Sequence, residues 1–224
     1  MLIVAVIIKI GSAGPVLFRQ QRIGFRGQRF TCLKFRTMVS EADTTVHQEY
    51  CQQLIDSDLP MVKMDVQGDR RLIPFGRQLR ACGLDELPQI INVLRGEMSL
   101  VGPRPCLLCE YEKHLPWQKR RFHTLPGLTG LWQVSGKNTT TFNEMICLDL
   151  WYDRDKSLWL DLKIMFRTIP ALTLQVRQMH DDPDVGPAMN REPNAGAHIR
   201  PVPRPVTLAG ANNDSPSSAG NLAR

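Results

Sequence analysis

The sequence predicts a helix-rich α/β fold that contains a short sheet. Its 224 residues and hydrophobic share of 42% are typical of a globular protein with one good core or two small ones. In residues 16–38, two short extended runs are separated by Gly24 and Gly27, which indicates a hairpin. Residues 143–175 show the pattern of two helices that separate near Asp155.

The other expected elements follow from local signals. Proline suits the first turn of a helix and glycine its end, so a helix is expected from Pro88 to Gly96. Ser157 is a candidate N-cap for the last helix. The remaining expectations are polar, helix-compatible sequence at 41–54, a loop or insertion at 56–71, a helix at 74–80, a tight loop at 99–105, helical sequence at 106–122, a short strand at 131–134 and a turn at 135–138.

Residues 1–10, MLIVAVIIKI, form an apolar opening segment. A helix that spans a bilayer needs about 20 apolar residues, and Lys9 interrupts this run, so the segment cannot span. It lacks the basic region and the cleavage site of a signal peptide. Two interpretations stay open: a buried strand or core helix, or half of a membrane-embedded helix.

Positive charge is concentrated at the start of the chain. The first 40 residues carry +7 and no acid, so the rest carries −1 of the formal charge of +6. Such a basic block attracts phosphate in a nucleic acid, a lipid headgroup or a nucleotide. Trp117 and Phe122, beside the cations at 119–121, suit a membrane interface, although a solvated helix face explains these charges almost as well.

The cysteines indicate a reducing compartment. The six cysteines show no repeated spacing of the kind that a disulfide framework has. Cys106 and Cys109 form a lone CxxC followed by His114, but no fourth zinc ligand is evident in register. Packed thiols on a helix are therefore the favoured interpretation.

Asp85 and Glu86 lie side by side just before the helix that starts near Pro88. An acid there can cap the helix or favour its dipole, and that simple interpretation stays open. However, Mg2+ uses one or two carboxylates together with substrate phosphate oxygens. Cations that can hold a diphosphate lie in glycine- and proline-rich segments on either side: Lys34, Arg36, Arg80, Arg95 and Arg104.

The two acids can divide the chemistry at one phosphoryl group. If one carboxylate binds the metal, the other is free to attack phosphorus and form an acyl-phosphate. Adjacent residues on a first helical turn point about 100° apart, so they can reach the same phosphoryl group from different sides. The free N–H groups of the helix end would help to hold phosphate.

Four segments resemble a known family in sequence and in order. They are GPVLFRQQRIGFRGQRFTCLKFRTM, LRACGLDELPQIINVLRGEMSLVGPRP, LPGLTGLWQVSGKN and LDLWYDRDKSLWLDLKIMFRTI. They are similar to the bacterial sugar transferases, the monotopic polyprenyl-phosphate phosphoglycosyl transferases, and the resemblance covers about Ile8 to Leu174. The combination DELPQ…GEMSLVGPRP is far more specific than a lone Asp-Glu pair.

The resemblance implies that the protein transfers sugar-1-phosphate from a UDP-sugar to undecaprenyl phosphate and releases UMP, which initiates exopolysaccharide or other surface-glycan synthesis. The family's nucleophile matches Asp85, and its Mg2+-binding acid matches Glu86. The implied setting is the cytoplasmic face of the bacterial inner membrane, in contact with its lipid and without nucleic acid. The basic residues of the family site match the phosphate-binding candidates Lys34, Arg36, Arg80, Arg104 and Lys137, the last of which is arginine in several members.

The resemblance and the composition together divide the chain into three parts. Residues 1–12 match the second half of a re-entrant membrane helix, which is therefore expected to be truncated. Residues 13–176 match a compact catalytic domain with amphipathic helices on the membrane surface. Residues 177–224 are rich in Pro, Gly and Ala and are expected to be disordered. Departures from the family pattern are Cys82 and Gly83 in place of small hydroxyl residues, and a long polar insertion at 41–68.

Two other classes of protein fit parts of the sequence. A catalytically inactive fragment can act as a basic membrane-docking module, but such a module gains nothing from an acidic pair in its basic surface. A nucleic-acid binder fits the pI near 9.2. However, the chain after residue 40 is nearly neutral and shows no helix-turn-helix, finger or RNP pattern. The enzyme is the better interpretation.

Overall fold

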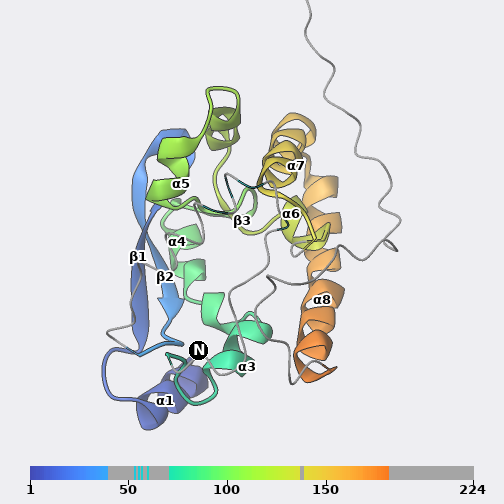
Figure 1. Cartoon of the computed structure of the whole chain (residues 1–224). Helices are drawn as coiled ribbons and strands as arrows, with labels where there is room; N and C mark the ends of the chain where they lie inside the picture. The colour runs from blue at the N-terminus through green and yellow to red at the C-terminus, as the bar shows by residue number, and fades with distance from the viewer. Residues whose placement is uncertain are drawn as a thin grey trace, which may run out of the picture. The chain divides into compact units, whose positions relative to one another are not determined.

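Two small sheets and a series of helices form the part of the chain that the computed structural model describes, which is residues 1–39, 53, 55, 57, 60, 71–136 and 139–181. These residues belong to one unit, Met1–Ala188. The predicted helix-rich α/β class is confirmed. With η for short 3-10 helices, the elements are α1 (Leu2–Gly11), β1 (Leu17–Ile23), η1 (Phe25–Gly27), β2 (Arg29–Phe35), α3 (Gly76–Ala81), η2 (Leu84–Glu86), α4 (Gln89–Leu94), β3 (Ser99–Val101), α5 (Leu108–Lys113), η3 (Gln118–His123), β4 (Gly127–Thr129), α6 (Leu131–Val134), α7 (Phe142–Asp155) and α8 (Leu158–Asp181) (Figure 1).

The predicted hairpin is present in the first part of the chain. Strands β1 and β2 are antiparallel, with Leu17 opposite Phe35. The turn between them contains Gly27, whose φ of 74° lies in the left-handed region. A Cβ at Gly27 would lie 2.7 Å from the Tyr111 hydroxyl. The turn therefore favours glycine both for its backbone angle and for space.

A second, parallel pair of strands differs from the prediction. Strand β3 lies within the stretch 99–105, where the sequence predicts a loop, and it pairs with β4, which precedes the strand predicted at 131–134. The strand β4 lies earlier because a Cβ at Gly127 would come within 2.1 Å of Gly102 N, so only glycine permits this close backbone contact. Residues 131–134 form helix α6 instead, since Leu131 and Trp132 are both buried and α6 packs on both α7 and α8.

The helical stretch predicted at 106–122 is divided into α5 and η3. Pro116 lies between the two helices, and the residue before a proline disfavours helical backbone angles. Arg121 and Phe122 are 1% and 6% exposed. The prediction that Phe122 and the cations at 119–121 face a membrane together is therefore wrong for these two residues, because they pack into the interior.

Helix α1 packs against the end of the hairpin and against α3. Val4 and Ile8 are buried in one core cluster with Phe35, Ile73 and Leu79 (Figure 1). A core helix therefore explains one face of the segment. The opposite side exposes large apolar side chains, namely Leu2, Ile3, Val6 and Ile10. Among the helices in the described ranges, none combines the length and the apolar character needed to cross a membrane.

Helices α7 and α8 separate near Asp155, as predicted. Ser157 Oγ accepts the N–H of Leu160 at 3.3 Å, which confirms Ser157 as the cap of α8. Helix α8 continues to Asp181 and thus enters the range 177–224 that the sequence assigns to a tail. The rest of that range, and most of the insertion at 41–68, lie outside the described residues.

Tyr152 of α7 connects both long helices to the second sheet. Its hydroxyl lies 2.7 Å from Asp161 Oδ1 of α8 and 3.2 Å from the carbonyl oxygen of Val101 in β3. Tyr152 and Val101 belong to the same core cluster as Leu131 and Ile164. Core packing therefore holds β3 in place where the following turn begins.

Candidate active site

Asp85 and Glu86 lie on the short helix η2, directly after α3. Gly83 makes the turn between the two helices with a φ of 68°, and a Cβ there would press against the Leu172 side chain of α8 at 3.1 Å. Asp85 is 8% exposed. Helix α4 begins without a side-chain cap hydrogen bond, so neither acid is its N-cap. The simple capping interpretation therefore loses its main support.

Lys34 joins the hairpin to the acidic pair. Its Nζ lies 2.8 Å from Glu86 Oε1, and the two side chains are 23% and 36% exposed. Phe35 of β2 packs in the same core cluster as Leu79 of α3 and Leu87, which holds the hairpin against η2. The fold thus brings two of the predicted site residues together at the boundary with solvent.

Arg36 uses part of its guanidinium to fasten the chain. Nη1 donates to the carbonyl oxygen of Ala13 at 2.6 Å, and Nη2 donates to that of Ser12 at 3.0 Å. The residue is 4% exposed. These bonds tie the loop after α1 to the end of β2, and the predicted contact of Arg36 with phosphate stays a prediction.

Arg80 and Lys137 are the other two basic candidates outside the turn after β3. Arg80 lies on α3, and its carbonyl oxygen accepts a hydrogen bond from Gln175 Nε2 of α8 at 3.4 Å. Lys137 lies outside the described residues. Phosphate binding by both therefore stays a prediction.

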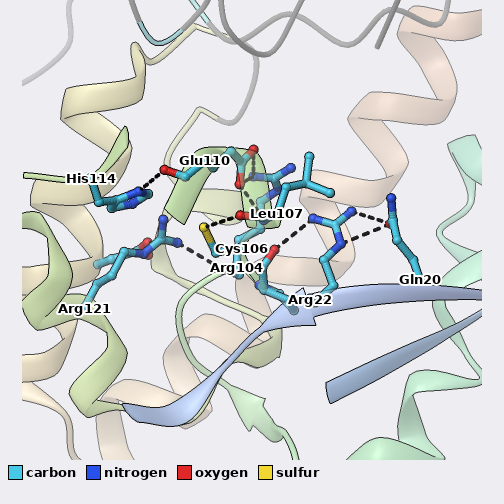
Figure 2. Close-up of polar contacts among 10 residues, drawn as sticks. Gln20, Arg22, Arg104, Cys106, Leu107, Glu110, His114 and Arg121 are labelled. Atoms are coloured by element: carbon cyan, nitrogen blue, oxygen red, sulfur yellow. Dashed lines mark hydrogen bonds and ion pairs between the residues drawn. The ribbon is translucent and has the colours of Figure 1, made fainter. Parts of the chain in front are cut away.

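Arg104 lies in the turn after β3 and is bound by a buried acid. Its Nη1 lies 3.0 and 3.2 Å from the two oxygens of Glu110, which is 1% exposed (Figure 2). Glu110 Oε2 also accepts the N–H of Leu107 at 2.8 Å. Burial alone would raise the pKa of Glu110, but the charges of Arg104 and Arg22 and the Leu107 N–H lower it to about 2. Glu110 is therefore ionised at neutral pH.

Arg22 of β1 and Arg104 together form a basic cluster. Its Nη1 donates to the carbonyl oxygen of Pro105 at 3.0 Å, and its Nε and Nη2 donate to Gln20 Oε1 at 3.0 and 2.7 Å (Figure 2). Pro105 follows Arg104 directly. The hairpin and the turn after β3 are therefore joined at the site of the basic cluster.

Cys32 is a buried residue of β2. Burial raises the pKa of its thiol, and the charges of Lys34, Arg22, Glu86 and Arg104 all act on it. Alternate residues of a strand lie on one face, so Cys32 and Lys34 share a face of β2. The charges of the Lys34–Glu86 pair and of the arginines near Glu110 thus both act on this face of the hairpin.

Arg121 and Asp149 form a buried pair behind the same turn. Arg121 Nη2 donates to the carbonyl oxygen of Arg104 at 3.0 Å and lies 2.6 Å from Asp149 Oδ2. Both side chains are at most 3% exposed. Burial raises the pKa of Asp149 to about 6, against the opposing effect of the Arg121 charge. This pair supports the backbone that carries Arg104.

The sequence analysis does not identify Glu110, Arg121 or Asp149 as parts of a site. Glu110 has a weak local signal, because a glutamate in the first turn of a helix can bond back to the backbone before it. Arg121 and Asp149 have none, since their pairing depends on how η3 and α7 pack together.

The cysteine prediction is confirmed in part, because Cys106 is a packed thiol but lies in a β-bridge with Ile23 before α5 and not on a helix. Its thiol is buried, lies 3.2 Å from the carbonyl oxygen of Leu107 and has a pKa raised by burial. His114 Nδ1 lies 2.5 Å from the carbonyl oxygen of Glu110. No group of three or more possible metal-binding side chains occurs within the described ranges. Cys106 is thus a packed thiol, as the sequence indicates.

A helix-rich α/β domain whose acidic pair contacts Lys34 fits an enzyme that acts on phosphate groups. The family model described as bacterial sugar transferase matches residues 1–175, and this chain belongs to that family. The resemblance in the sequence analysis is thereby confirmed.

Named relatives are similar in sequence to this chain over most of its length. The exopolysaccharide production protein ExoY of Sinorhizobium fredii is 39% identical, over 77% of this chain and 76% of the relative. The UDP-glucose:undecaprenyl-phosphate glucose-1-phosphate transferase of Caulobacter vibrioides is 43% identical, over 77% and 62%. The undecaprenyl-phosphate galactose phosphotransferase of Salmonella typhimurium is 39% identical, over 70% of this chain and 33% of its own length.

Proposed function

We propose that this chain transfers sugar-1-phosphate from a UDP-sugar to undecaprenyl phosphate, releases UMP and so initiates synthesis of an exopolysaccharide or another surface glycan. The names of the Caulobacter and Salmonella relatives support the acceptor and the sugar phosphate, and ExoY supports the product. The structural observation that carries the proposal is the contact of Lys34 with Glu86 beside Asp85. A docking module would have no use for this arrangement.

Asp85 is the proposed nucleophile. One of its carboxylate oxygens attacks the phosphorus that bears the sugar, the bond from this phosphorus to the UMP oxygen breaks, and UMP leaves. An oxygen of undecaprenyl phosphate then attacks the same phosphorus, and the bond to Asp85 breaks to restore the carboxylate. The acceptor phosphate is already anionic near neutral pH, so no strong general base is needed. One phosphoanhydride replaces another, and the equilibrium is near balance.

Mg2+ fits the acidic pair by its donor chemistry. This ion is usually bound by one or two carboxylates together with substrate phosphates, not by a complete protein cage. Asp85 and Glu86 supply such a pair, and Glu86 is the proposed ligand. When bound, Mg2+ supplies positive charge that stabilises phosphate oxygens.

The proposed phosphate ligands are the basic residues that match those of the family site. A guanidinium can grip two phosphate oxygens at once, whereas a lysine acts as a point charge. The arginines thus suit the diphosphate of the donor, and Lys34 suits the phosphate nearest Glu86. The set is Lys34, Arg36, Arg80, Arg104 and Lys137.

The proposed location is the cytoplasmic face of the bacterial inner membrane, where the acceptor lipid lies. Helix α8 exposes large apolar side chains interleaved with cations, which is the composition of a helix at a membrane surface. Lys163 Nζ lies 5.2 Å from the ring centre of Trp159. The exposed side chains are Leu158, Trp159, Lys163, Phe166, Arg167, Ile169 and Leu174.

Asp85→Asn tests the proposal. Protein extracted in detergent is given undecaprenyl phosphate, Mg2+ and each of a panel of UDP-sugars, and UMP release is measured. The parent releases UMP from at least one sugar nucleotide, whereas the variant releases none, because an amide cannot attack phosphorus. Asp155→Asn, at an exposed ion pair at the end of α7, is the matched control and stays active. Full activity of Asp85→Asn refutes the covalent scheme, and no UMP release by the parent refutes the function.

A further inference from the structure

Arg104 is held both at its side-chain guanidinium and at its backbone carbonyl. Glu110 contacts its guanidinium at 3.0 and 3.2 Å, and Arg121 donates to its carbonyl oxygen at 3.0 Å (Figure 2). We propose that Glu110 is a positioning residue, which orients the Arg104 guanidinium for the phosphates of the sugar nucleotide without touching the substrate itself.

Glu110 is itself held in place. Its Oε2 accepts the N–H of Leu107 at 2.8 Å, and its carbonyl oxygen lies 2.5 Å from His114 Nδ1. Its side chain is 2% exposed. A buried carboxylate bound to the start of its own helix has little freedom to follow a moving arginine. Glu110 therefore sets the orientation of Arg104, and not the reverse.

A second cation lies next to this part of the chain, since Arg22 Nη1 donates to the carbonyl oxygen of Pro105, the residue after Arg104, at 3.0 Å. Burial lowers the pKa of Arg22, the charge of Arg104 lowers it further, and the charge of Glu110 opposes both effects. The two guanidinium groups therefore lie close enough to repel each other. Glu110 is the acid that offsets this repulsion and keeps Arg104 in the cluster.

Arg104 can still reach a substrate from this position. Its side chain is 22% exposed, although the carboxylate that binds it is buried. A long side chain that is already ordered loses less rotamer entropy when it binds a ligand. A phosphate that approaches from solvent therefore meets an arginine that is already oriented.

The inference rests on the proposed function, and a double-mutant cycle tests it. The cycle compares the parent, Glu110→Gln, Arg104→Ala and the double variant in detergent. One measurement is kcat/KM for UMP release, and the other is equilibrium binding of UDP. Glutamine keeps the size of the side chain but removes its charge. Glu112→Gln, on the exposed side of α5, is the matched control.

We expect Glu110→Gln to lower kcat/KM and UDP affinity about tenfold when Arg104 is present, and less than about twofold in the Arg104→Ala background. Glu112→Gln changes neither value. If Glu110→Gln does not fold, Glu110→Asp replaces it, since the shorter acid keeps the charge and is expected to lose less.

The outcomes separate the two ideas. An equal loss in both backgrounds overturns the inference, because Glu110 would then act through folding alone. If the parent releases no UMP but the UDP-binding cycle shows the coupling, the proposed function fails and the positioning role is supported. If the parent does not bind UDP, both are overturned.

Discussion

Lys34 and Glu86 are 52 positions apart in the chain, yet Lys34 Nζ lies 2.8 Å from Glu86 Oε1. The contact places the end of β2 beside the short helix η2, which carries Asp85. Both side chains are partly exposed, so an ion pair of this kind adds little to stability. Its value lies in the position that it gives to the Glu86 carboxylate and in the positive charge beside it.

Lys34→Met separates this role from stability. We expect kcat/KM for UMP release to fall at least about tenfold, because a preorganised positive charge beside the phosphates is lost. The free energy of unfolding should change by less than about 1 kcal/mol. Lys113→Met, at an exposed position of α5, is the control. Unchanged activity with Lys34→Met would remove Lys34 from the site.

Asp149→Asn tests the buried pair through its pH dependence. The pKa of Asp149 is raised from 3.8 to about 6 in the folded protein, so the folded state binds this proton more tightly than the unfolded state does. The resulting stabilisation is fully present below about pH 4 and is lost as the pH rises through about 6. Asparagine does not titrate and lacks this dependence.

Between pH 4 and pH 7, the stability of Asp149→Asn relative to the parent should therefore rise, by up to about 3 kcal/mol. Urea unfolding across this range measures the difference. The comparison with the parent cancels other titrations, including that of Glu110, whose lowered pKa stabilises the fold above about pH 4. A difference that does not vary with pH would show that Asp149 is ionised throughout.

The exposed face of α8 predicts membrane binding that depends on apolar contact. The double variant Trp159→Ser, Phe166→Ser removes two side chains that are 66% and 72% exposed. We expect its partition onto vesicles with anionic lipid to fall at least about tenfold, since each large apolar side chain contributes about 2 kcal/mol on burial. Leu94→Ser, 82% exposed on α4, is the control. Equal partition of parent and double variant contradicts the proposed surface.

Local signals predict much of the fold. The hairpin follows from glycines between extended runs, and the break between α7 and α8 follows from Ser157. The loop prediction at 99–105 fails at 99–101, because β3 pairs with β4 over a long separation, through backbone contact that Gly102 and Gly127 permit. The strand predicted at 131–134 is helix α6 instead. Neither β3 nor β4 has a side-chain pattern that marks it.

The sequence likewise predicts one part of the candidate site and not the other. The sequence motif predicts Asp85, Glu86 and Arg104 as site residues. It does not indicate that Glu110 binds Arg104, or that Arg121 and Asp149 lie behind the turn. The contact of Asn92 is also not predicted by the sequence. Asn92 is fully buried, and its Oδ1 accepts the N–H of Leu33, which is 59 positions away in the chain.

The sequence by itself determined the family, the hairpin, the last two helices and the acidic pair, because each depends on neighbours within a few residues or on a specific motif. Tertiary structure alone decided which cation meets Glu86, which acid orients Arg104 and which side chains of η3 are buried. Those outcomes depend on how distant segments pack, since desolvation and charge pairing act between groups that only the fold brings together.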